Sequence, residues 1–339
     1  MLTRPSSESL STAGSTREAT PERPTVVRGC PFCGGKQVRV LFAVRDGFSI
    51  ADCPDCRVAS TVPPVPPDEI GCYYPPLYYG EKNRRFHPLL ERLVAFFRWR
   101  RVRRIERYVP RGRILDVGTG RGVLPGLMRE RGWEARGTEI SEIAARNALD
   151  LGLPVFVGDF LEAPYPAASF DVVVLWHVLE HIRDSHAALG KCRDLVRPGG
   201  LLVIAVPNFE SLQAALTRRH WFHLDVPRHY FHFRLSSLQR LLLEHGFRTV
   251  ETAHFSVEQN PYGWIQSLLN VLGFRYNLLY DLLKTASARK THPARAHPLQ
   301  TLLSLAALAP VVPLSFLLFG VETLLRRGGT IELYAIRES

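Results

Sequence analysis

Four cysteines near the N-terminus form two pairs with the spacing of a metal site. Cys30 and Cys33 make the first pair, and Cys53 and Cys56 follow nineteen residues later. The segment between the pairs is typical of a β-hairpin, which would bring the four sulfur atoms together. Thiolates bind Zn²⁺ tetrahedrally, and four protein ligands leave no position for a substrate. We therefore expect a structural zinc ribbon at residues 28–62.

A glycine-rich loop is the second candidate for chemistry. In the segment LDVGTGRG, residues 115–122, Asp116 precedes Gly118, Gly120 and Gly122 at every second position. Glycines let the backbone turn tightly and approach a ligand where a Cβ would collide, while Asp116 can orient a ligand's ammonium group. The spacing differs from the dinucleotide fingerprint GxGxxG, whose helix N-terminus holds a pyrophosphate. The loop favours a ligand with a methionine-type tail instead.

Two more signals lie at the ends of the next two expected strands. Glu139 ends the second strand, where its carboxylate can accept hydrogen bonds from both hydroxyls of a ribose. Asp159 and Phe160 follow the third strand. There Asp159 can accept from an adenine amino group while Phe160 covers the ring. Three signals in this order predict a nucleoside cofactor, and the alternative is a doubly wound fold with another ligand.

Histidines follow the fourth and the fifth expected strands. A base with a pKa near neutrality suits the removal of a proton from an acceptor. The candidate catalytic residues are His177, His181 and His229. Asp225 and Tyr230, in the same cluster at 220–233, are candidates for positioning a hydroxyl, and the aromatic residues there suit stacking on a sugar or ring. The alternative for this cluster is that its histidines cap and fill a loop.

These residues need a parallel sheet that brings the strand ends to one edge. From residue 112 short apolar runs alternate with helical segments, which is typical of a parallel sheet covered on both faces. The fold class is therefore α/β and doubly wound. We expect the strands at 113–117, 134–139, 155–158, 171–176, 201–207, 247–254 and 331–337.

The segments before this sheet carry their own expectations. Residues 1–27 are rich in Ser, Thr, Pro and Glu and indicate a disordered tail. Residues 63–86 are rich in proline and tyrosine and indicate an extended linker. Residues 87–108 have apolar positions at helical spacing with arginines between them. That helix either packs with a solvated arginine face or presents a surface to phosphates or anionic lipid.

An apolar segment lies before the last strand. Residues 302–321 contain no charge and are long enough to span a bilayer. Pro310 and Pro313 interrupt the segment, however, and the chain must return to the same side to supply its last strand. We therefore expect two short helices in a hairpin, which either dips into one leaflet or packs on the domain.

Composition and charge limit the class of protein and the kind of partner that this chain can have. The chain has 339 residues, of which 46% are hydrophobic and 22% charged, which excludes wholesale disorder and a multi-span membrane protein. A formal charge of +11 favours an anionic partner: nucleic acid, an acidic membrane leaflet or a phosphorylated substrate. Paired cysteines without an export signal indicate a metal in a reducing cytoplasm. Peripheral contact with the inner face of the membrane is open.

With these motifs in place, residues 112–255 resemble class I S-adenosylmethionine-dependent methyltransferases. The runs FDVVVLWHVLEHIRD and DLVRPGGLLVIAVPN are similar to the ubiquinone-biosynthesis O-methyltransferases. The ribbon, the tyrosine-rich linker, the segment DVPRHYFHF and the apolar insertion together resemble bacterial methyltransferases of sugar and surface-polysaccharide pathways. We place the methyltransferase domain at 87–255, the apolar insertion at 256–329 and the last strand at 330–339.

The resemblance implies a seven-stranded Rossmann-like sheet with an antiparallel last strand. It further implies S-adenosylmethionine as donor and an oxygen or carbon of a small or lipid-linked acceptor. In the quinone-pathway relatives, acidic residues and a histidine hold a divalent metal where this chain has His177, Glu180 and His181. His177 replaces a carboxylate of that pattern, which argues against a magnesium site here.

Two other functions compete with a small-molecule methyltransferase. Methyltransferases of ribosomal RNA can carry zinc modules and basic surfaces. The tetrad Asn/Asp-Pro-Pro-Tyr that places a base amine is missing, since residues 175–178 are Leu-Trp-His-Val. A non-catalytic docking module is the other alternative. The intact glycine loop, Glu139 and Asp159 argue against it.

Overall fold

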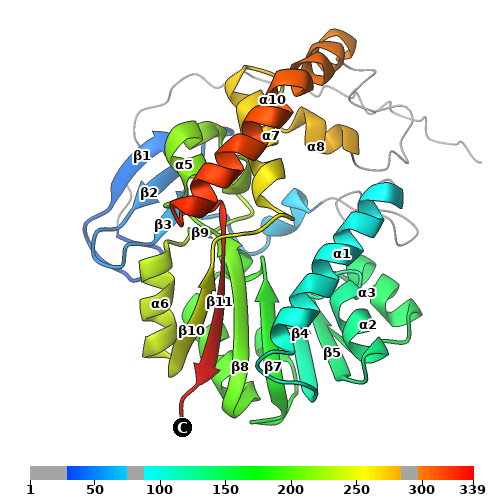
Figure 1. Cartoon of the computed structure of the whole chain (residues 1–339). Coiled ribbons are helices and arrows are strands. Elements are labelled where there is room, and N and C mark those ends of the chain that lie inside the picture. Colours follow the sequence, from blue (N-terminus) through cyan, green and yellow to red (C-terminus); the bar gives the residue numbers. More distant parts are fainter. Residues whose placement is uncertain (1–28, 75–87, 284–296) are drawn as a thin grey trace, which may run out of the picture.

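Two sheets organise the chain (Figure 1). The computed structural model describes residues 29–74, 88–283 and 297–339. The expected tail at 1–27 lies outside these residues, as does part of the expected linker. The larger sheet has seven strands in the order β10-β11-β8-β7-β4-β5-β6, and the smaller has the order β1-β2-β3-β9.

The larger sheet confirms the predicted α/β class. Its strands are β4 (Arg113–Val117), β5 (Glu134–Glu139), β6 (Val155–Val157), β7 (Phe170–Trp176), β8 (Val196–Pro207), β10 (Phe247–Ala253) and β11 (Thr330–Arg337). Strands β4 to β8 pair in parallel, whereas β11 is antiparallel to both β8 and β10. The order reverses between β4 and β7, and ligands bind beyond the carboxyl ends of strands at such a point.

Helices cover both faces of this sheet. Helices α1 (Pro88–Ile105) and α2 (Val123–Glu130) pack on one face, and α4 (Ser185–Leu195) and α6 (Leu235–Glu244) on the other. Along β7, Val172 and Val174 face the first pair of helices while Val173 and Leu175 face the second. This alternation follows from the two-residue period of a strand. Helix α3 (Glu142–Asp150) follows β5 and contacts β5 and β6.

The arginines of α1 are used inside the protein. Arg101 is buried and bonds Glu258 at 2.9 Å, and Arg104 pairs with Glu251 and Glu332. Neither alternative, a solvated face or a phosphate surface, is right for these two arginines. Their partners lie far along the chain, so local spacing could not reveal them. Buried charges of this kind persist only when they are paired.

The smaller sheet joins the N-terminal segment to the main domain. The expected hairpin is present as β1 (Arg39–Ala43) and β2 (Ser49–Asp52), and β3 (Ala59–Val62) follows. The fourth strand, β9 (Phe231–His232), comes from a loop of the main domain and pairs with β3. Buried side chains of both parts belong to one hydrophobic cluster. The N-terminal segment is therefore packed against the main domain rather than tethered to it.

The apolar insertion is helical but is not the expected hairpin. It contains α7 (Asn260–Val271), α8 (Leu278–Leu283) and α10 (Pro298–Leu324). Pro310 and Pro313 lie inside α10 without ending it. A proline removes one hydrogen bond and bends a helix more often than it reverses the chain. Ser304 and Ser315, one on each side of the prolines, are both buried, so α10 packs on the protein before and after them.

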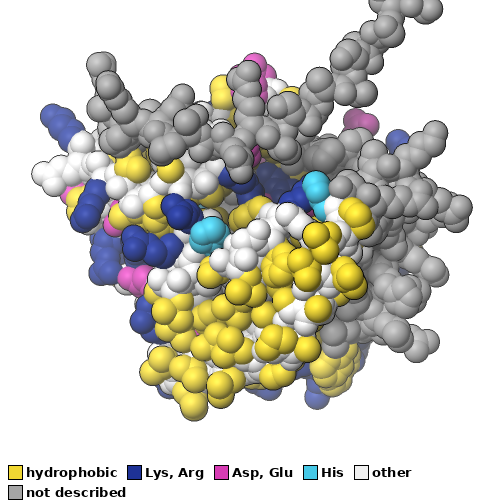
Figure 2. All heavy atoms as spheres, turned by 90° about the horizontal axis from the view of Figure 1, so that it is seen from above, with side chains coloured by type: hydrophobic (Ala, Val, Ile, Leu, Met, Phe, Trp, Pro, Cys, Tyr) yellow, Lys and Arg dark blue, Asp and Glu magenta, His cyan; other side chains and the backbone are white. Residues whose placement is uncertain are grey.

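Helix α10 crosses the top of the molecule in Figure 1. Within the described residues it is long and apolar enough to cross a membrane by length and composition. Figure 2, which looks onto this face, shows hydrophobic side chains gathered where α10 lies. Helix α5 (Leu212–Thr217) lies near the end of α10 that leads into β11.

Candidate functional site

The glycine loop between β4 and α2 has the conformation that its sequence predicts. Gly118, Gly120 and Gly122 have φ values of 66°, 54° and 74°. A Cβ on Gly118 would lie 2.6 Å from Val178 Cγ2, so a larger residue has no room there. Near Gly120, by contrast, no atom lies within 4 Å of the Cβ position. The loop is tightly packed on one side and open on the other.

Two carboxylates at strand ends face this loop. Glu139 accepts hydrogen bonds from the backbone N–H of Gly120 at 2.8 Å and of Ser141 at 3.0 Å. Burial raises the pKa of Asp116 to about 6 and also raises the pKa of Glu139. A buried carboxylate is stabilised by any ligand that brings a cation or hydrogen-bond donors. Both residues therefore suit a ligand with an ammonium group and hydroxyls.

Asp159 and Phe160, the third predicted cofactor signal, have local structural roles in the fold. Asp159 accepts a hydrogen bond from Leu161 N at 2.9 Å and caps the 3₁₀ helix η3 (Phe160–Glu162). Phe160 is buried in the main hydrophobic cluster. Their contact with an adenine ring stays a prediction.

Two arginines of α1 that sequence analysis did not predict as site residues, Arg98 and Arg101, lie near the same strand ends. The guanidinium of Arg101 lies 3.3 Å from the ring centroid of Trp176. Arg98 is close enough to Asp116 to influence its pKa, and its Nη1 atom is buried without a hydrogen-bond partner in the described structure. Burial lowers the pKa of Arg98 to about 10. A buried guanidinium with a free N–H suits a carboxylate ligand.

His177 follows β7 directly and forms a pair with Glu180. Its Nδ1 lies 3.2 Å from Glu180 Oε1, and its Nε2 is buried without a partner in the described structure. Its φ of 54° is uncommon for a residue with a side chain and typical of functional sites. Burial lowers the pKa of His177 to about 4 and raises that of Glu180 to about 7. At neutral pH the imidazole is thus uncharged and has a free nitrogen.

His181 and His229 meet on the other side of Glu180. Their ring centroids are 4.5 Å apart. Nδ1 of His181 lies 3.1 Å from the carbonyl oxygen of Arg228, and Nδ1 of His229 lies 3.0 Å from that of His223. Carbonyl oxygens only accept, so each Nδ1 donates, and in a neutral ring the lone pair is then on Nε2. The hydroxyl of Tyr74 also lies 3.0 Å from Nδ1 of His181. The structure thus brings together all three histidines that the sequence singled out.

This cluster has the donor set of a metal centre. Ligand atoms of Glu180, His181 and His229 all lie within 4.8 Å of one another. Oε2 of Glu180 is buried without a partner in the described structure, and the hydrogen-bonded Nδ1 atoms orient both imidazoles. Two imidazoles and a carboxylate suit a divalent transition metal. His229 takes the place that the sequence pattern gave to His177.

The four cysteines fit a zinc ion. The Sγ atoms of Cys30 and Cys56 are 3.7 Å apart, as are those of Cys33 and Cys53, and all four lie within 4.8 Å of one another. Sulfur atoms at about 2.3 Å from a tetrahedral zinc are about 3.8 Å apart. A Cβ on Gly35 would lie 2.5 Å from Asp55 Oδ2 and 3.2 Å from Cys33 Sγ, so a larger residue here would crowd the cysteine cluster.

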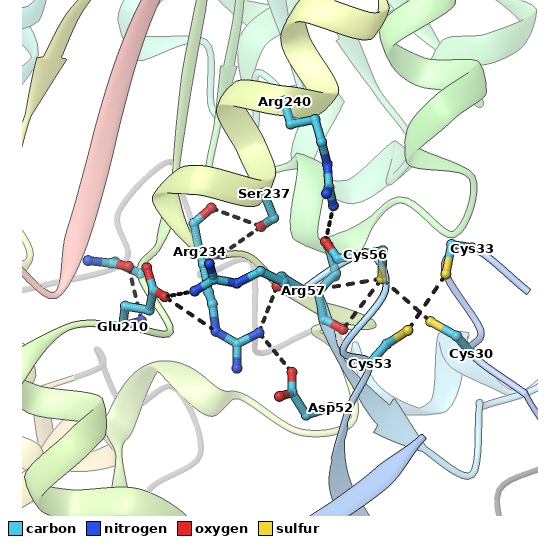
Figure 3. Close-up of polar contacts among 12 residues, drawn as sticks. Cys30, Cys33, Asp52, Cys53, Cys56, Arg57, Glu210, Arg234, Ser237 and Arg240 are labelled. Carbon is cyan, nitrogen blue, oxygen red and sulfur yellow. Dashed lines mark hydrogen bonds and ion pairs between the residues drawn. The ribbon is translucent and has the colours of Figure 1, made fainter. Parts of the chain in front are cut away.

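Charged residues lock this cysteine cluster to the main domain (Figure 3). Arg234 Nη1 donates at 2.7 Å to both Asp52 Oδ1 and the carbonyl oxygen of Arg57. Arg240 of α6 donates to the carbonyl oxygen of Cys56. The knuckle that carries Cys53 and Cys56 is therefore held from the side of the main sheet.

The same module supports the histidine cluster. Thr61 of β3 donates through Oγ1 to the carbonyl oxygen of His229 at 2.6 Å and through its backbone N–H to Tyr230 at 3.0 Å. The N–H of Tyr230 in turn donates to the carbonyl oxygen of Glu180 at 2.9 Å. Arg45, in the β1–β2 turn, donates to the carbonyl oxygen of Val226 at 3.0 Å. The loop that supplies His229 is thus held between the N-terminal module and the segment after β7.

The chain was compared with known proteins. A family model described as "Methyltransferase domain" matches residues 83–252. A ubiquinone biosynthesis O-methyltransferase from Proteus mirabilis is 32% identical over 126 residues, which cover 35% of this chain and 48% of the relative. The same enzyme from Aromatoleum aromaticum is 29% identical over 48% of this chain and 75% of the relative. This chain spans about half the length of the Proteus relative and of one from Photorhabdus laumondii.

Solved structures of similar fold were also found. One is an S-adenosylmethionine-dependent methyltransferase from Archaeoglobus fulgidus, 22% identical, with a TM-score of 0.44 over 71% of this chain and 94% of that chain. Another is phosphoethanolamine N-methyltransferase 2 from Haemonchus contortus, 17% identical, with a TM-score of 0.46 over 71% of this chain and 53% of that chain.

Proposed function

Because this chain belongs to the class I S-adenosylmethionine-dependent methyltransferases, we propose that it transfers a methyl group from that donor to a small acceptor. One observation carries the proposal. Gly118 of the cofactor loop packs against Val178, the neighbour of His177. Donor loop and histidine cluster therefore share one edge of the sheet, at the point where the strand order reverses.

The cofactor assignments follow from the charges at that edge. Asp116 would bind the ammonium group of the methionine tail and Arg98, with its free Nη1, the carboxylate. Glu139 would accept hydrogen bonds from the ribose hydroxyls, and Asp159 and Phe160 would contact the adenine. The loop glycines Gly118, Gly120 and Gly122 let the backbone approach the tail. When bound, the cofactor supplies an electrophilic methyl group on a sulfonium.

His177 is the favoured general base. Transfer of the methyl group to an acceptor hydroxyl would leave the cofactor sulfur as a neutral thioether and would require the hydroxyl proton to leave. The free Nε2 of His177 can take that proton, while Glu180 stabilises the charged imidazole through Nδ1. Holding the acceptor in line contributes more than the base alone. His181 and His229 would position the acceptor.

A metal at Glu180, His181 and His229 is the alternative way to activate the same hydroxyl. The two versions differ in their sensitivity to chelation. With a histidine base alone, turnover survives dialysis against a chelator that leaves the cysteine site loaded. With a metal, turnover is lost and returns on adding a divalent ion.

We propose a hydroxyl or carbon of a sugar or glycan-pathway compound, in lipid-linked form, as acceptor. Ring contacts run from His177 to the buried His223 and on to Phe222 and Tyr262, and an aromatic wall of this kind suits an acceptor that carries a ring. The apolar α10 favours a lipid-linked form and a cytoplasmic protein peripheral to the inner face of the membrane. The names of the O-methyltransferase relatives favour transfer to oxygen and make a prenylated phenol the next acceptor class.

The other functions are less well supported. An RNA methyltransferase would need the arginines of α1 at the surface, but Arg101 and Arg104 are paired internally. A docking module would not need the close packing of Gly118 or the histidines around Glu180.

The test is calorimetric titration with S-adenosylmethionine and its demethylated product. Wild type is compared with Asp116→Asn and Arg98→Met, and with Arg136→Met as a matched change of an exposed arginine. We expect micromolar-range binding that falls at least tenfold in the first two variants only. Transfer of labelled methyl is then measured on nucleotide sugars, lipid-linked glycans, phenols and RNA. Absence of cofactor binding by folded protein would refute the proposal.

A further inference from the structure

Helix α10 has its polar residues inside and its apolar residues outside. The buried positions are Ser304, Val311, Ser315, Phe319 and Glu322. The exposed large hydrophobic residues of the helix are Leu299, Leu302, Leu303, Leu305, Leu314, Phe316, Leu317, Val321 and Leu324. A surface helix of a globular protein has the reverse distribution. Solvation of this outer face in water is unfavourable over the whole length of the helix.

Helix α7, the partner of α10, is buried over most of its length and includes polar residues among its buried ones. Its buried residues include the polar Asn260, Gln266 and Asn270, whereas Val271 and Leu272 at its end are 49% and 61% exposed. The polar groups satisfy one another inside, as Gln266 Nε2 donates to Asn270 Oδ1 at 3.0 Å. Trp264 Nε1 donates to Glu322 Oε2 at 2.9 Å across the two helices. Polar contacts between helices with an apolar exterior are typical of proteins in lipid.

Arginines border the apolar face. At or near the C-terminal ends of α5, α7 and α10, an exposed leucine (Leu216, Leu272 and Leu324) is followed within three residues by an exposed arginine. The arginines are Arg218 and Arg219 after α5, Arg275 after α7, and Arg326 and Arg327 after α10. Figure 2 shows basic side chains beside the hydrophobic area on this face. An apolar surface with a basic border fits the interface of a bilayer that carries anionic headgroups.

We propose that α7 and α10 insert together into one leaflet of an anionic membrane, with the outer face of α10 among the acyl chains. Helix α10 does not cross the bilayer in this arrangement, because it packs on α7 and leads directly into β11 of the central sheet. An insertion depth of about 5–10 Å covers the exposed leucines and leaves the arginines at headgroup level.

Membrane insertion also predicts how an acceptor reaches the site, and this prediction rests on the proposed function. The inner side of α7 borders the histidine cluster, since a Cβ on Gly263 would lie 2.7 Å from His223 Nε2, and His223 stacks on His177. The inserted helices thus lie directly beside the cluster, and a headgroup carried by a membrane lipid would reach the cluster from the side of the leaflet while its tail stays there.

Sedimentation of the full-length, zinc-loaded protein with vesicles tests the insertion. Vesicles of phosphatidylcholine alone are compared with vesicles that also contain phosphatidylglycerol. The variant Leu302→Gln/Leu317→Gln/Leu324→Gln changes only exposed residues, and Leu243→Gln on α6, 62% exposed, is the matched control. We expect the triple variant to lose roughly tenfold in binding for each leucine and the control to bind as wild type does. Arg219→Gln/Arg326→Gln should weaken binding to the anionic vesicles only.

Two results would overturn the insertion. The first is a wild type that does not sediment with either vesicle. The second is a wild type that forms a dimer which the leucine variant dissociates, without vesicle binding, since the apolar face then belongs to a second copy. Titration of each preparation with S-adenosylmethionine keeps this outcome separate from the proposed function, because cofactor binding should be equal in all variants.

Discussion

At the scale of single residues, Glu180 connects the groups that could activate an acceptor. One of its oxygens contacts His177, and the other is buried beside His181 and His229. Burial raises its pKa to about 7, so its ionisation falls within the range where enzymes are assayed. A carboxylate at this place acts through His177 or through a metal, and either role needs the ionised form.

The pH profile of turnover should therefore report Glu180. Below its pKa of about 7 the carboxyl is protonated and cannot stabilise a charged His177, so kcat/KM should rise with pH and level off above about 7. Glu180→Gln should lower kcat/KM roughly 100-fold and remove this rise. The measurement is kcat/KM at pH values below and above about 7. Glu142→Gln, on the exposed side of α3, is the control. A Glu180→Gln variant with an unchanged profile would assign the ionisation elsewhere.

Gly118 makes a prediction about cofactor affinity. Alanine there places a Cβ against Val178 and at a φ that L-residues rarely adopt. Gly118→Ala should bind S-adenosylmethionine about tenfold more weakly or worse, and Gly118→Ala/Val178→Ala should recover part of the loss. Gly190→Ala, in α4 and with open space at its Cβ, is the matched control and should bind normally. Equal affinity in all these variants would separate the loop from cofactor binding.

Residue types and spacing predicted which residues gather at the site. Each of the three histidines follows a strand, and the carboxyl ends of parallel strands share an edge. Arg98, Arg101 and His223 were not predicted as site residues. Arg101 is held in place by its ion pair with Glu258. His223 lies in a loop whose path depends on the smaller sheet. Such contacts between distant segments leave no local pattern in the sequence.

At the scale of elements, the N-terminal module holds the acceptor side of the site. Thr61 bonds the backbone at His229 and Tyr230, and the cysteine cluster is fixed to α6 by Arg240. The cofactor side, built from β4, β5 and the loop after β4, does not contact the module through these bonds. The two halves of the reaction therefore depend on different elements.

Removal of the metal from the cysteine site should affect the acceptor side of the site and not the cofactor side. A chelator strong enough to empty the cysteine site should abolish methyl transfer while cofactor affinity changes less than about twofold. Thr61→Val should reduce kcat roughly tenfold with zinc still bound, because one hydrogen bond to the His229 backbone is lost. Thr61→Ser keeps the donor and should restore the rate. Parallel loss of cofactor affinity and of turnover would indicate general unfolding instead.

Glu322 is buried near the end of α10 and makes the stability of the folded protein depend on pH. Burial raises the pKa of Glu322 from 4.5 to about 8, so the folded protein keeps a proton that the unfolded chain releases above about 4.5. Stability should therefore fall as pH rises between these values. Glu322→Gln lacks this penalty, and its melting temperature relative to wild type should increase from pH 5 to about pH 8. Scanning calorimetry at several pH values tests this, and a constant difference would contradict it.

The course of α10 shows a limit of element prediction. Pro310 and Pro313 predict a break from sequence alone, because each removes a backbone donor. The helix continues because Val311 and Ser315 pack on either side of Pro313. The sheet was predictable, by contrast, since short apolar runs alternate with amphipathic helices whatever the distant contacts are.

At the scale of the whole molecule, three parts converge on the histidine cluster. The central sheet supplies the cofactor loop and His177, the N-terminal module braces His229, and α7 lies against His223. Sequence analysis predicted boundaries between these parts but could not show that they share a core. Trp221, Phe231 and Phe233, all fully or nearly buried, fill the space where they meet.

The position of β11 has a consequence for how the protein folds during its synthesis. Strand β11 lies between β8 and β10, yet it follows α10 in the chain. While the ribosome extends the polypeptide, β8 and β10 have no strand between them until residues 330–337 emerge. Helix α10 precedes this strand in the chain and docks beside a sheet that β11 has yet to complete. Until β11 is in place, the apolar helix and the facing edges of β8 and β10 are unprotected together, and a membrane or a chaperone would protect them during that interval.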